Sequence, residues 1–285
     1  MTHHMNMSKM ISSDISPTPV RSSIERGEAI VELVRTAGFQ SIESLASQFD
    51  VTPQTIRRDV NLLCDHGILR RRHGGVDVPS TGENLAYPMR QVLNIDAKRA
   101  IARRVAREVP EDASLFFGIG TTPEQCAHAL VEHTHLRVMT NNINVAVALS
   151  SNPQCEITLA GGRIRNLDQD MVSSEAHNFF SRFSVDIGIY GVAGVADDGT
   201  LLDFSSDEVH MRNELCTHCR QRFLVLDHSK FGRSATVRGG HITDATVVFT
   251  DKPISIELEN QLHNAGVRLI ICSDPVLPRN FRRSG

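Results

Sequence analysis

Short apolar segments recur along the later part of the chain, and they alternate with stretches that have the apolar spacing of helices. This alternation is typical of a mostly parallel β-sheet covered by helices. A basic helix over about Ile95 to Glu108 precedes the first strand. We therefore predict an α/β domain over residues 95–274. Its strands are SLFFGIG, LRVMT, CEITLA, VDIGIYG, RFLVLD, TVVFT and VRLIIC, between Ser114 and Cys272.

Glycine, threonine and asparagine residues follow three successive strands of this predicted sheet. Ligands of open parallel sheets bind at the carboxyl ends of the strands. Glycines let backbone N–H groups approach an anion, hydroxyl and amide side chains add donors, and a helix begins directly after Thr122. We therefore predict a site for a phosphorylated small molecule, with a plain strand-to-helix turn as the alternative for each loop. The candidate residues are Gly118, Gly120, Thr121, Thr122, Asn141, Asn142, Gly161 and Gly162.

Two charged residues later in the chain are further candidates for this site. Lys230 follows another predicted strand and would supply a cation to a phosphate, whereas a surface lysine that caps carbonyl groups is the alternative. Glu208 lies with Asp203 and Asp207 near a helix start. Because the helix dipole favours carboxylates there in any protein, a ligand role and a structural role both stay open for Glu208.

A smaller domain with three helices is predicted over residues 22–78. Ser41 can cap a short helix, and Thr52 followed by Pro53 is a strong start for the next one, because proline lacks an N–H that would be unpaired there. Gly67 would end this helix. Two helices joined by a short turn form a helix-turn-helix, whose second helix puts its first residues into the DNA major groove. Its buried stripe is predicted to be Ile56, Val60 and Leu63.

The polar face of this second helix and the basic segment after it contain the candidate DNA contacts. The segment ILRRRHGGVDV predicts a two-stranded wing with a turn at Gly74–Gly75. From Gln54 to His73, five arginines stand against Asp59 and Asp65, a local charge of +3 in a chain of net charge −3. A solvated charged face is the alternative, but these charges occupy the positions where a winged helix meets DNA. The candidate contacts are Thr52, Gln54, Thr55, Arg57, Arg58, Arg70, Arg71, Arg72 and His73.

The run FQSIESLASQFDVTPQTIRRDVNLLCDHGILRRRHGG closely resembles the N-terminal signature of the DeoR family of bacterial repressors. GIGTTPE, TNN, LAGG and DHSKFGR resemble the effector domain of the same family, so that the resemblance covers about residues 23–272. It implies a repressor, a homodimer or homotetramer, that binds double-stranded operator DNA and leaves it when a phosphorylated metabolite binds the C-terminal domain. The implied effector is glycerol 3-phosphate, with ketose or aldose phosphates as alternatives.

The implied fold is a small α+β winged helix-turn-helix domain followed by an α/β effector domain with a mostly parallel sheet, similar to sugar-phosphate isomerases. An isomerase is therefore the alternative function. Those enzymes carry paired carboxylates after a strand for proton transfer. The comparable stretch IYGVAGVADDG has Val192 and Ala193 at the start of its loop, and Asp197–Asp198 beside Gly199 indicates a turn. We expect a regulator that is not an enzyme and needs no cofactor.

Two features near residue 216 need separate interpretation, a pair of cysteines and a difference from related proteins. Cys216 and Cys219 form a CxxC pair, but a structural zinc site needs four ligands and no second such pair occurs. We expect two ordinary thiols on one face of a helix, and no metal site. Related proteins commonly show a Lys-Arg pair where this chain has Met211–Arg212. A ligand contact by that lysine would have no counterpart here.

The ends of the chain and the stretch between the two domains have the composition of irregular segments. Residues 1–21 and 275–285 are predicted to be tails, and residues 79–94, rich in Pro, Gly, Ser and Asn, a linker. The sequence contains no apolar run of about 18 residues, so we expect no membrane span. Six scattered cysteines indicate reduced thiols and a cytoplasmic protein.

Overall fold

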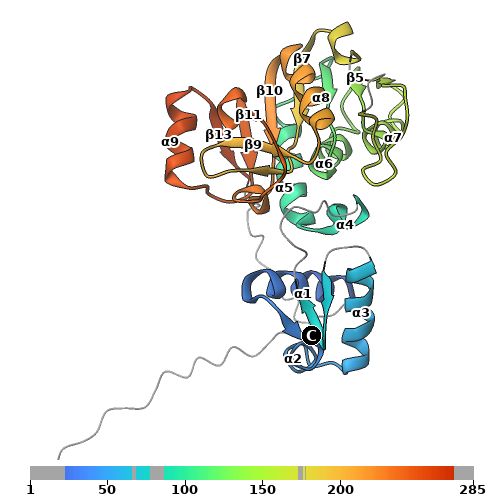
Figure 1. The fold of residues 1–285 in the computed structure, drawn as a ribbon. Coiled ribbons are helices and arrows are strands. Elements are labelled where there is room, and N and C mark those ends of the chain that lie inside the picture. Colours follow the sequence, from blue (N-terminus) through green and yellow to red (C-terminus); the bar gives the residue numbers. More distant parts are fainter. Residues whose placement is uncertain (1–22, 66–68, 78–86, 173–175, 177, 273–285) are drawn as a thin grey trace, which may run out of the picture. The chain divides into compact units, whose positions relative to one another are not determined.

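The computed structural model describes residues 23–65, 69–77, 87–172, 176 and 178–272. The chain divides into two compact units, residues 1–79 and residues 80–285. The first contains helices with a small sheet, and the second is an α/β unit with a large parallel sheet (Figure 1). The predicted fold class is therefore confirmed. No helix among the described residues is both long enough and apolar enough to cross a membrane.

In the described part of the first unit, three helices pack with a three-stranded antiparallel sheet. Both predicted helix starts are confirmed, because Ser41 Oγ accepts from Ser44 N at 3.0 Å and Thr52 Oγ1 accepts from Thr55 N at 3.2 Å. The apolar stripe predicted for the helix after Thr52 (Ile56, Val60 and Leu63) is buried. Gly67, the predicted helix end, lies outside the described residues. The elements are α1 (Ser23–Ala37), β1 (Gln40–Ser41), α2 (Ile42–Gln48), α3 (Pro53–Asp65), β2 (Arg70–Arg72) and β3 (Gly75–Asp77).

The predicted wing is present as β2 and β3, and β1 adds a third strand that the sequence does not predict. The strand order is β1-β3-β2, and Ser41 of β1 faces Gly75 of β3. This pairing requires glycine, because a Cβ atom at Gly75 would lie 2.1 Å from the carbonyl oxygen of Gln40. Strand β1 has only two residues, which is too short for an alternating pattern, so the sequence alone does not reveal it.

A buried ion pair joins α1 to α3. Arg26 Nε lies 2.6 Å from Asp59 Oδ2, and Arg26 Nη2 lies 3.2 Å from Asp59 Oδ1, which makes a two-pronged contact. Asp59 is only 6% exposed. The local charge of +3 counted over residues 54–73 includes the negative charge of Asp59. Arg26, which lies outside that stretch, compensates this charge. The exposed basic face is therefore more positive than that count suggests.

We predict that Asp59→Asn lowers the free energy of unfolding of the first unit by about 2–4 kcal/mol, because Arg26 would remain partly buried without a counter-charge. Hydrogen exchange of the α1 and α3 amides in the full chain measures this loss. Asp65→Asn is the matched control, since Asp65 lies on the same helix and is exposed. Equal protection in the two variants would contradict the role of the pair.

Seven parallel strands form the large sheet of the second unit, in the order β13-β12-β10-β7-β4-β5-β6. All seven predicted strands are present. Chain order runs outward from β4 in one direction and from β7 in the other, so the order reverses between these two strands. Ligands of open parallel sheets bind at such a switch point. The strands are β4 (Ser114–Phe117), β5 (Arg137–Thr140), β6 (Glu156–Leu159), β7 (Val185–Tyr190), β10 (Cys219–Val225), β12 (Val247–Thr250) and β13 (Arg268–Ile271).

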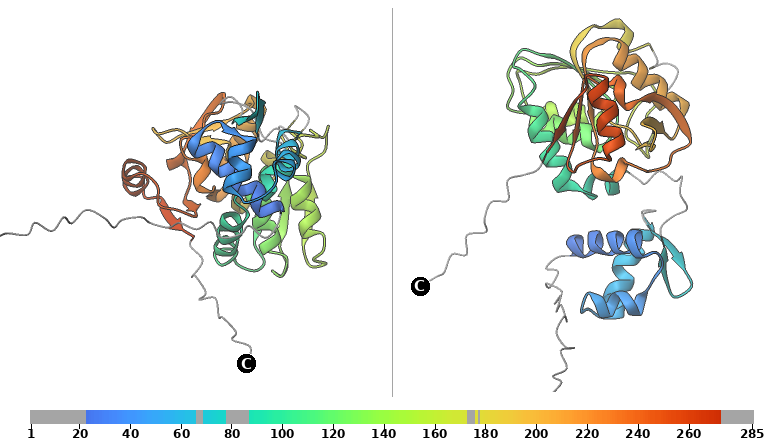
Figure 2. Two further views of the ribbon diagram at one scale, coloured as in Figure 1. Left: turned by 90° about the horizontal axis from the view of Figure 1, so that it is seen from below. Right: turned by 90° about the vertical axis from the view of Figure 1, so that its left-hand side faces the viewer.

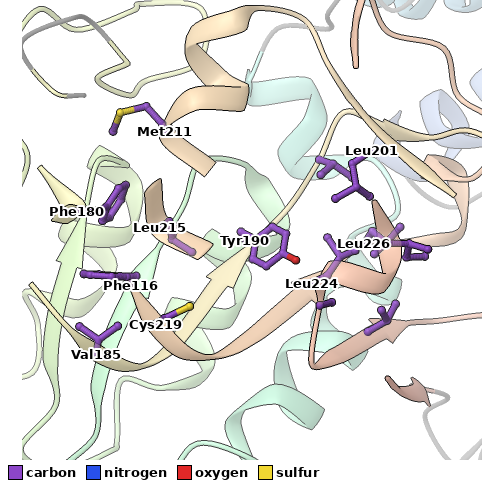
Figure 3. Packing of buried hydrophobic residues seen from close by; sticks show 14 of the residues in the cluster. Phe116, Phe180, Val185, Tyr190, Leu201, Met211, Leu215, Cys219, Leu224 and Leu226 are labelled. Atoms are coloured by element: carbon purple, nitrogen blue, oxygen red, sulfur yellow. The ribbon is translucent and has the colours of Figure 1, made fainter. Parts of the chain in front are cut away.

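Helices cover both faces of this sheet (Figure 1 and Figure 2). Successive residues of a strand point to opposite faces, so the sheet has one apolar layer on each face. Phe116 and Tyr190 pack in one layer with Met211 and Leu215 (Figure 3). Leu115, on the other face of β4, belongs to the second layer. The first layer includes α8 (Ser206–Thr217) and α9 (Ile256–Asn264), and the second includes α5 (Ile95–Ala106), α6 (Thr121–Ala129) and α7 (Ile143–Leu149).

A second, antiparallel sheet with the order β11-β9-β8 lies beside the large one, and the sequence does not predict it. The turn expected at Asp197–Asp198 joins β8 to β9 and ends at Gly199, whose φ of +86° favours glycine. This sheet brings Asp203, at the end of β9, towards the carboxyl ends of the parallel strands. Its strands are β8 (Gly194–Val195), β9 (Thr200–Asp203) and β11 (Val237–His241); short 3₁₀ turns are η1 (Phe180–Arg182), η2 (His228–Lys230) and η3 (Ile242–Asp244).

Part of the predicted linker is ordered structure of the second unit. Tyr87–Val92 form helix α4, which contacts α6, and Tyr87 is fully buried. The prediction of a linker through residue 94 is wrong for these residues. A six-residue helix has too short a pattern to be recognised in sequence, and Pro88 within its first turn resembles loop composition.

Candidate functional site

The exposed face of the first unit contains the candidate DNA contacts on α3 and on the wing. Arg57 and Arg58 are exposed, whereas Thr55 is half-buried and bonded to the capping Thr52. On the wing, Arg71 donates to Asn61 Oδ1, and Arg72 lies 3.3 Å from Asp77. The first contact joins the wing to α3, and the second links its two strands β2 and β3. The remaining candidates are also exposed: Thr52, Gln54, Arg70, Arg71, Arg72 and His73.

A cleft opens in the second unit where the strand order reverses between β4 and β7. Its empty volume is about 570 Å³, which includes space open to solvent. Its walls come from α4, the start of α6, the loop after β6, the loops after β7 and β9, and the segment after β10. The polar lining residues are Arg90, Thr121, Thr122, Asp168, Asp170, Asp203, Glu208, Lys230 and Arg233.

One end of the cleft is built to hold an anion. Gly120 adopts φ +117° and caps α6 without any side-chain hydrogen bond to the first N–H groups of that helix. Those groups belong to Thr121 and Thr122, which line the cleft, and the positive end of a helix binds phosphate well. The Gly120 carbonyl faces away and accepts from Tyr87 Oη and Asn142 Nδ2, both at 3.3 Å.

Lys230 also lines the cleft, and its pKa lies below that of an ordinary lysine. Loss of solvation, followed by the nearby charge of Arg233, lowers the pKa of Lys230 to about 7. The alternative, a surface lysine that caps carbonyl groups, does not fit a half-buried side chain that lines the cleft. An entering anion would offset both causes and hold the ammonium form.

Asp168, Asp170, Asp203 and Glu208 also line the cleft, and arginines hold these carboxylates in place. Arg165 bonds both oxygens of Asp170 at 2.7 Å and reaches Glu208 at 2.8 Å. Arg212 lies 2.9 Å from Asp203, and Asp203 also accepts from Ala193 N at 3.1 Å. Burial raises the pKa of Asp203 to about 6 in spite of Arg212. Carboxylates in fixed positions can accept hydrogen bonds from hydroxyl groups of a ligand.

The structure brings together about half of the predicted effector residues. Gly120, Thr121, Thr122, Glu208 and Lys230 line the cleft. The other five lie elsewhere: Gly118 and Asn141 line a smaller adjoining cavity, Asn142 caps α7 with its side chain, and Gly161 and Gly162 are exposed and outside the lining of both cavities.

Sequence reasoning missed several residues of the cleft. Asp168 and Asp170 lie in a loop that carries no recognisable motif, and Arg90 was assigned to the linker. For Asp203 the sequence does give a signal, because this residue lies with Glu208 near a predicted helix start, where a ligand role stays open. The loop that begins at Val192 and Ala193 was expected to lack carboxylates, yet Asp203 reaches Ala193 N from the neighbouring strand β9.

The smaller cavity shares four lining residues with the cleft and lies deeper in the sheet. Gly118 and Asn141 line it together with Met211. Asn141 Nδ2 donates to Met171 O at 3.0 Å, but its buried Oδ1 has no hydrogen-bond partner. Met211 is buried in the apolar layer, so this position serves packing where a lysine would bring charge. The shared residues are Ile119, Gly191, Asp203 and Glu208.

Models of two protein domains match the chain, one for each unit. A DeoR-like helix-turn-helix domain matches residues 26–82, and a DeoR C terminal sensor domain matches residues 93–252. The chain belongs to the DeoR family. The predicted DeoR-type regulator with a DNA-binding domain and a sensor domain is thereby confirmed.

Curated relatives in the DeoR family match almost the whole chain. It is 40% identical over 248 residues to the "Glycerol-3-phosphate regulon repressor" of Escherichia coli (strain K12), which covers 87% of this chain and 98% of that relative. It is 42% identical to the protein of the same name from Haemophilus influenzae, over 88% of this chain and 98% of that relative. These relatives are transcriptional repressors.

The solved structures that match this DeoR-family chain are distant. The "Ribose 5-phosphate isomerase from Plasmodium falciparum" is 13% identical and gives a TM-score of 0.34, over 47% of this chain and 52% of that chain. A likeness of this size does not bear on function.

The sequence predicts that Cys216 and Cys219 share one face of a helix. In this DeoR-family chain the two cysteines lie on different elements instead. Cys216 is in α8, which ends at Thr217, and Cys219 begins β10. Burial raises the pKa of Cys216 to about 12 and that of Cys219 to about 11. Among the described residues, no three His, Cys, Asp or Glu side chains are grouped so that they could hold a metal ion. The pair therefore has the character of packed thiols.

We predict that iodoacetamide at pH 7.5 modifies Cys216 and Cys219 roughly 100-fold more slowly than an unperturbed thiol, because so little thiolate is present. Mass spectrometry after timed quenching measures the rates. The half-buried Cys64 and Cys155 serve as internal controls and should react first. Rapid modification of the pair, or a zinc-dependent rise in melting temperature, would contradict this account.

Proposed function

We propose that this DeoR-family protein represses genes of glycerol-3-phosphate metabolism and that glycerol 3-phosphate releases it from operator DNA. The observation that carries the proposal is the cleft, whose lining combines a helix N-terminus and cations with fixed carboxylates. The named function of relatives at 40% and 42% identity supports the choice of effector. No cofactor takes part in the proposed function.

The two kinds of lining residue match the two ends of glycerol 3-phosphate. Its phosphate would lie at the N-terminus of α6, near Lys230 and Arg233, where helix dipole and side-chain charges favour a dianion. Its hydroxyl groups would donate to the carboxylates of Asp203 and Glu208, which arginines hold in place. A longer aldose or ketose phosphate would offer the same groups.

The exposed residues of α3 support the proposed mode of DNA binding. Gln54 and Arg58 lie near the start of a helix whose opposite face is buried, which is where a recognition helix meets base edges. Arginine bonds guanine and glutamine bonds adenine in two-pronged fashion. The arginines of the wing would contact phosphates and fix the register.

We propose a homodimer or homotetramer, because each chain supplies one recognition helix and such proteins bind paired half-sites about one helical turn apart. The effector releases DNA only if it binds one conformation of the sensor more tightly than the other. Coupling of about 1–3 kcal/mol per site would change operator affinity about 5- to 150-fold.

We propose binding without turnover. An isomerase needs a carboxylate free to move a proton, whereas arginines engage Asp170, Asp203 and Glu208 in this cleft. Titration of the operator complex with a panel of phosphoesters, glycerol 3-phosphate included, tests the proposal directly. Release by one ester without chemical change of that ester is the expected result. Turnover in the absence of DNA would overturn it.

We predict that Arg58→Ala weakens operator binding by roughly 1–3 kcal/mol if the guanidinium contacts a base. Fluorescence anisotropy with labelled operator measures the affinity at fixed salt. Arg220→Ala is the matched control, because Arg220 is an exposed arginine of the other unit. Unchanged affinity in Arg58→Ala would remove this residue from the base-reading face.

We predict that Lys230→Ala keeps operator affinity and weakens effector binding, so that more glycerol 3-phosphate is needed for release. The lost contact is a charge-assisted hydrogen bond, which corresponds to roughly 10- to 100-fold in affinity. Lys252→Ala, an exposed lysine outside the cleft lining, is the control. Loss of operator binding in Lys230→Ala would instead indicate a structural role.

The low pKa of Lys230 also predicts a pH dependence of effector binding. Above pH 7 the free side chain is mostly neutral, and a bound anion raises its pKa again, so binding takes up a proton. Affinity should therefore fall by up to about tenfold per pH unit between pH 7 and 8.5, where a phosphoester is already a dianion. Calorimetry in buffers of different ionisation enthalpy measures this uptake, which should be much smaller in Lys230→Ala.

A further inference from the structure

Helix α4 contributes one side chain to the cleft, that of Arg90. Residues 78–86 join β3 of the DNA-binding unit to this helix, so α4 is the first described element of the sensor after the chain leaves that unit. An effector residue on α4 would therefore be the nearest one along the chain to the DNA-binding domain. No other lining residue of the cleft precedes Ile119.

The guanidinium of Arg90 uses only part of its hydrogen-bonding capacity. Nη2 donates to Asp168 Oδ1, whereas Nε is buried and has no hydrogen-bond partner. A buried donor without a partner is unfavourable, and a tetrahedral oxyanion can satisfy Nε and an Nη group together through two of its oxygens. Arg90 is therefore better suited to a bound phosphoester than to its present partner alone.

Asp168 does not depend on Arg90 for charge compensation. Arg165 Nη2 lies 3.5 Å from Asp168 Oδ2, while the same guanidinium holds Asp170 and Glu208. If Arg90 turned towards a ligand, Asp168 would keep a neighbouring cation. The cost of leaving a buried carboxylate unpaired, which normally prevents such an exchange, is thereby reduced.

The position of α4 is set by contacts to the cleft loops. A six-residue helix has little stability of its own, so these contacts determine where it lies. Tyr87 Oη donates to Gly120 O at the anion site, and Gln91 Nε2 donates to Glu124 Oε1 at 2.8 Å. The buried ammonium of Lys98 donates to Arg90 O and Leu93 O, which fixes the end of the helix. A change at Arg90 therefore acts on a helix tied to the site at both ends.

We propose that Arg90 binds the anionic group of the effector in exchange for Asp168, and that this exchange makes α4 the element through which the cleft acts on the DNA-binding unit. The inference rests on the proposed function, since it assigns a ligand contact and a route of coupling to the same effector site. Asp168 is, in this scheme, an internal competitor of the effector. Removing the competitor and removing the cation must therefore have opposite effects.

The test compares Arg90→Gln and Asp168→Asn in the full-length protein, by calorimetry with glycerol 3-phosphate. Arg90→Gln should weaken binding roughly 10- to 100-fold, since it loses charge-assisted hydrogen bonds. Asp168→Asn should tighten binding roughly two- to fivefold, since it removes one ion pair from the free state. If Arg90 and Asp168 served only to shape the cleft, both variants would weaken binding, and that outcome overturns the proposal.

A second ion pair of the same chemistry provides the matched controls. Arg220 Nη1 lies 3.4 Å from Asp186 Oδ1 near the start of β7 and β10, at the opposite end of the strands from the cleft. Arg220→Gln and Asp186→Asn should change effector affinity less than twofold. Circular dichroism and melting temperature of all four variants show whether each one is folded. Asp168→Asn keeps the proposal falsifiable if Arg90→Gln does not fold.

Operator release at saturating effector separates coupling from binding. Wild-type protein should lose operator affinity, whereas Arg90→Gln should keep its operator affinity even when calorimetry shows the cleft to be full. Full release by saturated Arg90→Gln would overturn the role of α4.

Failure of the proposed function itself is recognised in the wild-type protein. If glycerol 3-phosphate gives no heat but ribose 5-phosphate or fructose 6-phosphate does, the effector assignment fails and the same variants are compared with that ester. If none of these esters and no inorganic phosphate binds the wild-type protein, both proposals are overturned.

Discussion

The carbonyl group of Gly120 is the point on which the sensor unit depends. It accepts hydrogen bonds from Tyr87 of α4 and from Asn142, the cap of α7, at 3.3 Å each. Gly120 also has the positive φ that turns β4 into α6, so one peptide unit fixes the anion-binding end of α6 and two further helices. Because these elements share one acceptor, the Gly120 peptide links the positions of α4, α6 and α7.

Charge pairing accounts for the shape of the cleft as much as apolar packing does. Carboxylates as deeply buried as Asp170 and Asp203 exist in ionised form only beside cations, and Arg165 and Arg212 supply them. The result is a polar cleft lined by cations and by carboxylates whose charge is compensated, and the proposed ligand carries both an anion and hydroxyl donors.

The sequence predicted what depends on local signals and missed what depends on contacts between distant residues. Helix starts at Ser41 and Thr52 and all seven parallel strands follow from capping residues and apolar runs. The loop after β6 does reach the cleft, but through Asp168 and Asp170 and not through the predicted Gly161–Gly162, which directly follow this edge strand. Strand order is a tertiary property, so no local pattern contains it.

The predicted linker, residues 79–94, is a second region where local composition does not reveal contacts to distant residues. Composition marks this stretch as irregular, yet Tyr87 is fully buried and Arg90 lines the cleft. In the proposed mechanism, the effector contacts α4, the first described element of the sensor unit, so the coupling requires no separate pathway through the sheet. By linkage, operator DNA must then act on the cleft with the same coupling free energy that the effector exerts on DNA binding. In the proposed mechanism, Arg90 is the residue at which these two effects meet.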